Sequence, residues 1–167
     1  AEFREQLADG SEMTAEDHVR QLRSYAEVYQ GFDSYPEGSR EALFFYRLEA
    51  LDTSMAIPVL LEMLREPDSE EDKNQFLVYL ESYLVRRAVC CLTYKSYNRI
   101  FVDMIKHLAA TTFSSAELLN FLLARKGDSA EWPTDDQFRE AFCGYEIYRS
   151  MKQARTRMVL EAIEGAM

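Results

Sequence analysis

The sequence predicts an all-α fold, a single irregular bundle of about eight helices in which residues 1–167 form one domain. Apolar residues recur at three- and four-residue steps along nearly the whole chain, which is the spacing of one face of an α-helix. No segment shows the alternation of a half-buried strand. Only 6 Gly and 4 Pro occur in 167 residues, too few for a turn-dense β architecture. No fixed period repeats, so a solenoid is not indicated.

The first predicted helix begins after Thr14, a suitable N-cap, and ends at Gly31. A loop follows at residues 32–39. The apolar stripe that we expect to face the core comprises Val19, Leu22, Ala26 and Tyr29.

Two further helices are predicted before residue 66. Ser39 caps a short helix so densely apolar that we expect it to be buried on most sides, through Ala42, Leu43, Phe45, Tyr46 and Leu48. Pro58 suits the first turn of the next helix, which ends near Arg65. The carboxylate-rich stretch 66–74 is predicted to be a solvated loop.

Two apolar stripes predict the helices that follow. The first comprises Phe76, Leu80, Tyr83, Leu84, Ala88, Cys91 and Leu92. The second comprises Tyr97, Phe101, Met104, Ile105 and Leu108.

The last third of the chain opens two helices with capping-box patterns, at residues 114–117 and 134–137. Gly127 is expected to close the first of them. A final helix is predicted after Gly144, with one face made by Ile147, Met151, Ala154 and Met158.

Charge is unevenly distributed along the chain. The net charge is −10, which disfavours general binding of nucleic acid by electrostatics. Residues 1–82 carry 7 basic and 19 acidic groups, whereas residues 83–167 carry 12 basic and 10 acidic groups. Any anionic ligand is therefore expected to bind the second half.

Several classes of protein are disfavoured by what the sequence lacks. It contains no GxxxxGK[ST], GxGxxG, HExxH or GxSxG motif. His18 and His107 have no partner at ligand spacing, so no metal, no cofactor and no catalytic residue is assigned. No apolar run approaches the roughly 18 residues that cross a bilayer, so no membrane partner is expected.

The three cysteines predict reduced thiols and a cytoplasmic location, because an odd count does not make a disulfide framework. Cys90 and Cys91 are adjacent and would point about 100° apart on a helix, so they are interpreted as small buried residues rather than a redox pair.

The strongest candidate for a contact site is the basic segment 83–107, which holds five basic groups and one acid. Its candidate contacts with DNA or a protein partner are Arg86, Lys95, Asn98, Arg99 and Lys106. Arg87 lies instead on the apolar face of its helix. We expect it to form a buried structural ion pair, with Glu49 or Glu81, because an unpaired buried charge is costly; a ligand-binding role is the alternative.

Four segments resemble the helical region of the GmrSD-type family, the modification-dependent (type IV) restriction proteins of bacteria and archaea. They are residues 80–87 (LESYLVRR), 91–101 (CLTYKSYNRIF), 132–138 (WPTDDQF) and 157–164 (RMVLEAIE). The resemblance extends over about residues 15–164. The Arg-Arg and Asn-x-x-Phe elements are fairly specific together and weak apart.

This resemblance implies a non-catalytic helical scaffold. Such family proteins begin with a ParB-like NTPase domain and end with an HNH-like nuclease domain, and the motifs of both are missing here. The chain would then be a segment of a longer protein, with no cofactor of its own. Its partners would be neighbouring NTPase and nuclease domains in the same or a partner chain, and DNA could be touched through residues 86–106.

A second hypothesis is a free-standing helical module that binds a protein partner. The acidic first half and aromatics that could be exposed, such as Tyr35 and Trp132, would suit a basic or apolar partner. A hydrolase that uses a carboxylate pair is disfavoured, because no base and nucleophile converge in the sequence.

Overall fold

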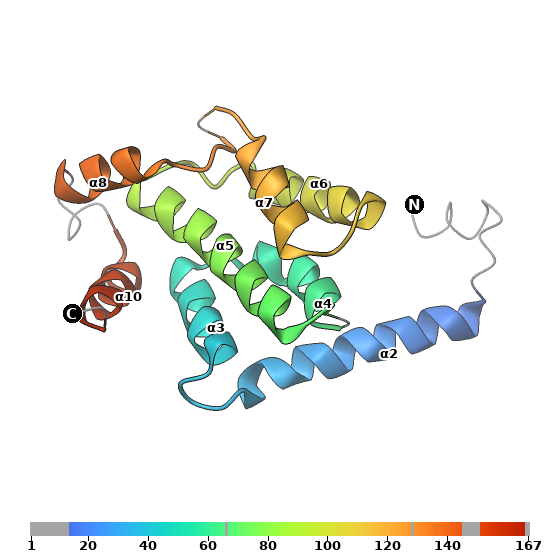
Figure 1. Cartoon of the computed structure of the whole chain (residues 1–167). Helices are drawn as coiled ribbons and strands as arrows, with labels where there is room; N and C mark the ends of the chain where they lie inside the picture. Colours follow the sequence, from blue (N-terminus) through green and yellow to red (C-terminus); the bar gives the residue numbers. More distant parts are fainter. Residues whose placement is uncertain (1–13, 66, 128, 145–150, 166–167) are drawn as a thin grey trace.

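In the computed structural model, a long central helix, α5 (Glu70–Val89), is surrounded by the other helices (Figure 1). The structure describes residues 14–65, 67–127, 129–144 and 151–165. Within these ranges there are eight α-helices, two short 3-10 helices and no strand, so the all-α prediction is confirmed. In chain order the other elements are α2 (Ala15–Gly31), η1 (Phe32–Ser34), α3 (Arg40–Leu51), η2 (Ser54–Ala56), α4 (Ile57–Arg65), α6 (Tyr97–Ala110), α7 (Ser115–Leu123), α8 (Asp135–Gly144) and α10 (Gln153–Glu164).

The helices pack mainly through α5. Helices α3 and α7 pack directly on it, α6 packs on α4 and α7, and α8 meets the C-terminal end of α5. Helix α10 packs on α3, and α2 runs along α4 and projects beyond it (Figure 1). None of the helices in the described ranges combines the length and the apolar character needed to cross a bilayer.

The core is centred on the apolar stripe of α5. Phe76, Leu80 and Tyr83 are completely buried, as the spacing predicts. The predicted stripe of α6 is also largely buried, at Tyr97, Phe101, Met104 and Leu108, while Ile105 is partly buried against the core. Removing these side chains from water supplies most of the energy that holds the bundle, because burial of apolar area is the dominant favourable term in folding.

Local capping signals were predicted well. The Thr14 hydroxyl accepts a hydrogen bond from the Asp17 amide, and the Asp17 carboxylate accepts one from the Thr14 amide. These two bonds form a capping box at the start of α2. Thr134 and Gln137 exchange the same two bonds at α8, and Ser39 caps α3 as expected. Each such cap is worth about 1 kcal/mol.

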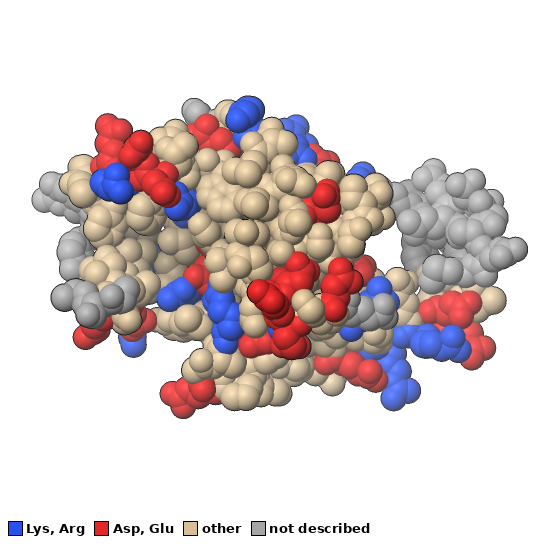
Figure 2. Space-filling view, viewed as in Figure 1, with Lys and Arg blue, Asp and Glu red and all other residues tan. Residues whose placement is uncertain are grey.

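The predicted loop at residues 66–74 is wrong from Glu70 onward, because α5 begins there. Ser69 caps the helix by accepting from the Asp72 amide at 3.1 Å. The carboxylates of the first turn favour this start, since negative charge is stabilising at the positive end of the helix dipole. Figure 2 shows acidic side chains gathered over this end of α5.

The predicted core face of α2 is also wrong. Val19 and Leu22 are 66% and 64% exposed, and no described residue of the helix is buried. The face that meets α4 carries Tyr25 instead, whose hydroxyl donates to the Glu62 carboxylate and whose ring lies 5.2 Å from the Arg65 guanidinium. Because α2 packs on one neighbouring helix, its other apolar stripe stays in solvent.

Two smaller corrections concern the faces of α3 and the end of α7. Helix α3 buries Phe44 and leaves Leu43 and Tyr46 exposed, so it is covered on fewer sides than predicted. Helix α7 ends at Leu123, four residues before Gly127, in a tight turn closed by the Arg125 amide and the Leu122 carbonyl.

The C-terminal helix begins only at Gln153, because Lys152 before it is extended. Met151 is buried but precedes the helix, and Ile147 lies outside the described residues. Cys91 follows α5 in a left-handed conformation, with φ of 53°, and is exposed, so its interpretation as a buried residue is wrong.

Candidate functional site

A groove of about 620 Å³ opens at the end of the bundle where α8 and α10 meet α5 and α3. In Figure 2 the surface is hollowed there, between the α8 and α10 segments at the left of the view. Its walls are mainly apolar, and they are made by Val78, Val85, Phe138, Phe142, Val159 and Ile163. This volume is within the range of ligand-binding pockets, about 300–1,000 Å³.

Helical spacing on three helices produces these walls. On α5, Val78, Ser82 and Val85 follow one another at steps of four and three residues, on a side of the helix other than the core stripe. On α8, Phe138 and Phe142 are four residues apart, and their rings stack with centroids 6.1 Å apart. Apolar side chains so arranged and left partly in solvent make this groove a candidate binding site.

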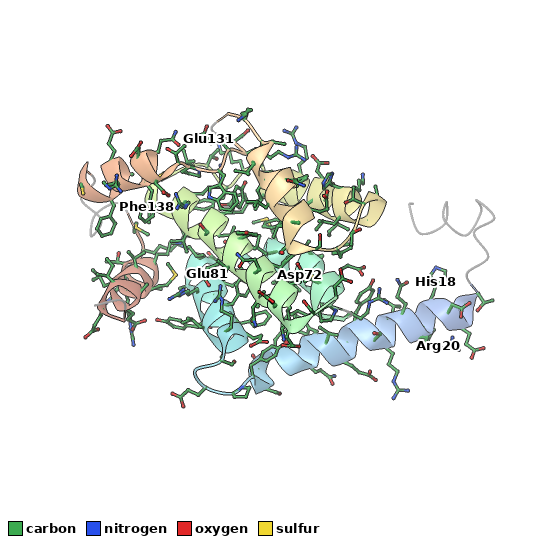
Figure 3. The ribbon with its side chains drawn as sticks, viewed as in Figure 1. His18, Arg20, Asp72, Glu81, Glu131 and Phe138 are labelled. Atoms are coloured by element: carbon green, nitrogen blue, oxygen red, sulfur yellow. The ribbon has the colours of Figure 1, made fainter. Side chains whose placement is uncertain are left out.

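A charged cluster forms the rim on the α3 side. The Glu81 carboxylate of α5 lies 2.7 Å from an Arg40 guanidinium nitrogen and also binds Arg47, and all three side chains are largely withdrawn from solvent. Figure 3 shows Glu81 between α3 and α5. Two arginines share one carboxylate, so this rim carries an excess of positive charge.

Arg86 forms the rim on the α8 side. Its Nε donates to the Ser82 hydroxyl at 3.1 Å, one terminal nitrogen donates to the Pro133 carbonyl at 3.1 Å, and the other binds Asp135. Its guanidinium lies 5.6 Å from the centre of the Phe138 ring. The Arg86 side chain is 25% exposed and that of Asp135 is 76% exposed, so the pair lies at the surface of the groove.

Arg87, by contrast, points into the core and is completely buried, as predicted. Its terminal nitrogens donate to the carbonyls of Glu131 and Thr93, each at 2.8 Å. The guanidinium also lies 5.5 Å from the ring centres of Tyr83 and Tyr97. Glu131 is labelled in Figure 3 beside the segment that joins α7 to α8.

The predicted carboxylate partners of Arg87 are corrected by this geometry. Glu81 binds Arg40 and Arg47 instead, and Glu49 is exposed on α3. Within the described residues, two backbone carbonyls and two ring faces lie against the charge of Arg87, which fits a structural role. Burial raises the pKa of the Tyr83 and Tyr97 hydroxyls, so both stay neutral beside the guanidinium.

The other residues of the predicted basic segment lie away from the groove. Asn98, Arg99 and Lys106 are exposed on α6, and Lys95 is exposed in the turn before it. The spacing of 98, 99 and 106 places these three side chains on one outward face of α6. The structure therefore groups four of the five candidates near α6 and separates Arg86 from them.

The groove itself was missed by the sequence reasoning. One available signal was the Phe138–Phe142 pair at i,i+4, and the second apolar side of α5, at Val78 and Val85, was another. Trp132, expected as an exposed aromatic, is half-buried, and the centre of its ring lies 6.3 Å from that of Tyr79, edge to face, with planes 66° apart.

Side chains that could hold a metal ion are scattered over the described residues. Within them, no group of three or more His, Cys, Asp or Glu side chains is placed to hold a metal ion. His107 faces the Glu117 carboxylate at 3.3 Å, and His18 contacts the Thr14 carbonyl at 3.0 Å, both in helix-end positions. The groove is suited to binding. Its apolar floor can contact the apolar side of a ligand, and the arginines at its two rims can contact anionic groups of the same ligand.

Comparisons with protein-family models, with curated proteins and with solved structures gave no match to this chain. The resemblance to GmrSD-type restriction proteins therefore stays a prediction from the sequence.

Proposed function

We propose that this chain is a non-catalytic helical binding module whose groove holds an amphipathic, acidic helix of a protein partner. The observation that carries this proposal is the mainly apolar groove of about 620 Å³ between two arginine-bearing rims. Helix-in-groove recognition uses this combination, because an apolar helix face fills the floor while flanking charges fix the orientation.

The charges of the rim select an acidic partner over a basic one. Arg47 and Arg86 stand on opposite sides of the groove: Arg47 shares the Glu81 carboxylate with Arg40, and Arg86 is paired with the exposed Asp135. Helix carboxylates that flank the apolar face would replace Asp135 on Arg86 and add to Glu81 near Arg47. A basic helix would be repelled at the rim where Arg40 and Arg47 share Glu81, so specificity comes from repulsion as well as attraction.

Binding of a designed peptide tests this function. The probe is an amphipathic helical peptide with leucines at i, i+3, i+4 and i+7 and flanking glutamates, and its control has lysines in place of the glutamates. Titration calorimetry should detect the glutamate peptide at least tenfold more tightly. Equal affinity of the two peptides, or no saturable binding of either, would overturn the proposal.

A matched pair of variants places the peptide in the groove. Val78 lines the groove and is 42% exposed, whereas Val102 lies on α6, outside it, and is 49% exposed. Val78→Glu should weaken binding of the glutamate peptide about tenfold or more, and Val102→Glu should leave it unchanged. The same loss in both variants would exclude the groove as the site.

The resemblance to restriction proteins supports a more specific form of this proposal. In that form the chain is a scaffold in a modification-dependent DNA-defence protein, and the helix in the groove belongs to a neighbouring NTPase or nuclease domain. A cytoplasmic setting belongs to the same form and agrees with the three free cysteines.

The proposed role in a DNA-defence protein includes contact with DNA through the exposed face of α6, and this contact can be tested separately. Arg99→Ala and Lys106→Ala should each reduce the salt dependence of DNA binding by about one unit of slope, because each removes one phosphate contact. Fluorescence anisotropy with duplex DNA at several salt concentrations measures it. Unchanged slopes in both variants would remove DNA from the proposal and leave the peptide groove standing.

A further inference from the structure

A second cavity, of about 480 Å³, lies where the end of α2, η1, the outer side of α3 and the turn into η2 meet. Its lining differs from that of the groove in both polarity and charge. Aromatic rings form one wall, and three carboxylates, Asp33, Glu49 and Asp52, stand around it. No lysine or arginine is among the residues that line it.

The aromatic wall is a continuous stack. The Phe32 and Phe45 rings stack with centroids 4.2 Å apart, and Tyr35 stacks on Phe45 at 5.7 Å with planes only 10° apart. Tyr29 at the end of α2 continues the wall at 5.4 Å from Phe32. The face of such a ring carries partial negative charge and attracts cations, more strongly when the site is partly desolvated.

The three carboxylates are exposed and spread around this wall rather than gathered at one point. Among the described residues no three acidic side chains converge closely enough to hold a metal ion, so this cavity does not fit a bare divalent cation. A larger cation, with its charge spread over carbon and nitrogen, can touch a ring face and approach a carboxylate at the same time.

The chain itself already places an ammonium group at the rim. The Lys152 amine lies 3.0 Å from an Asp52 oxygen, and both side chains are well exposed. The hydrogen bond from Lys152 holds the pKa of the Asp52 carboxyl below its usual value. Asp52 therefore already has an ammonium partner within the chain, and Asp33 and Glu49 are the other carboxylates that line the cavity beside the aromatic wall.

From these observations we infer that the cavity lined by Tyr29, Phe45, Asp33 and Glu49 binds an organic cation, an ammonium or guanidinium group carried on apolar carbon. Two sources supply this chemistry: a free small amine, or a lysine or arginine side chain of another protein. The site is independent of the acidic-helix groove, since the two share no lining residue and select opposite charges.

Paired ligands test the inference. The free-cation probe is choline, and its control is the uncharged carbon isostere dimethylbutanol; the side-chain probe is a capped Gly-Lys-Gly peptide. Protein-detected NMR titration should show saturable shifts at Phe45 and Tyr29 with choline, with the peptide or with both. Choline alone indicates a free amine, and the peptide alone indicates a protein side chain. Equal binding of dimethylbutanol and choline, or no shift with either cation, would overturn the inference.

Variants separate the charge of the site from the general acidity of the protein. Glu49→Gln should weaken cation binding about threefold or more, whereas Glu140→Gln, which removes an exposed carboxylate of α8, should not. Tyr29→Leu keeps an apolar side chain but removes a ring, and should cost roughly two- to fivefold in affinity. Equal losses of cation affinity in Glu49→Gln and Glu140→Gln would show that only the net charge of the protein matters, and would refute the site.

Discussion

Helices α2 and α5 begin alike and end up in opposite environments. Both are long, both start at a hydroxyl N-cap, and both carry acidic residues in the first turn. Yet α5 buries eight residues, including Phe76, Leu80 and Tyr83, and α2 buries none. Similar local signals therefore form both helices, and only tertiary packing distinguishes them.

The number of packing neighbours explains the difference. Helix α5 is covered by α3, α7 and α8, whereas α2 rests on α4 and η1. The ion pairs that decorate α2, such as Arg23 with Glu27, are exposed and contribute little. We therefore expect α2 to open independently of the core, with a low local free energy of opening.

The largest expected effect comes from truncating the same residue type in each helix. Leu80→Ala in α5 should lower the free energy of unfolding by about 2–5 kcal/mol, because it leaves a cavity in a closed core. Leu22→Ala in α2 should change it by less than about 0.5 kcal/mol, because the side chain is already in water. Urea unfolding measures both, and comparable losses would mean that something covers the α2 stripe in solution.

Arginines sharpen the same comparison. Arg87→Met should cost about 1–3 kcal/mol, because it leaves the partly buried carbonyls of Thr93 and Glu131 without the donor that the buried guanidinium supplies. Arg23→Met on α2 should cost no more than about 0.5 kcal/mol. Thermal melting of the two variants checks this, and an Arg87→Met protein that melts like the parent would contradict a structural role for Arg87.

Removing the caps should produce different kinds of change. Ser69→Ala is expected to lower global stability by about 1 kcal/mol, since α5 unfolds with the core. Thr14→Ala removes an equivalent cap, but it should speed amide exchange only within α2. Hydrogen exchange resolved by residue distinguishes the outcomes, and faster exchange in α5 of the Thr14→Ala variant would show that the two helices open together.

The smallest effect concerns pH. The hydrogen bond from Lys73, 2.6 Å from Glu41, holds the pKa of that carboxyl below its usual value. Because the folded pKa is the lower one, the contact stabilises the protein fully above about pH 4.5 and is lost as the pH falls through the folded value. In the Glu41→Gln variant, the free energy of unfolding should fall less steeply as the pH is lowered below about 4.5. Glu27→Gln on α2 serves as the control and should leave that slope unchanged.

How far the sequence predicted the fold depended on the range of each interaction. Caps at Thr14, Ser39 and Thr134 act over three residues, so their patterns were readable. The side of α2 that packs is decided by Tyr25 and Glu62, which are 37 residues apart, and periodicity does not contain that information. The start of α5 was missed because its acidic first turn was interpreted as a loop.

The candidate site follows the same rule. Burial of Arg87 was predictable, because it sits on the apolar face of its own helix. Its acceptors were not, since Glu81 was already taken by Arg40 and Arg47 from α3. The groove joins α5 to α8 and α10, so its existence depended on how distant segments meet, although the Phe138–Phe142 spacing was visible.

The two carbonyls held by Arg87 have a consequence for the topology of the chain. Between Thr93 and Glu131 lie both α6 and α7, so one guanidinium fastens the two ends of that excursion to the C-terminal end of α5. Closing a loop of this length costs chain entropy that grows only slowly with its size. An insertion or a cut at the exposed turn between α6 and α7 would therefore leave Thr93 and Glu131 bound to Arg87, and the two ends of the segment would stay together at the end of α5.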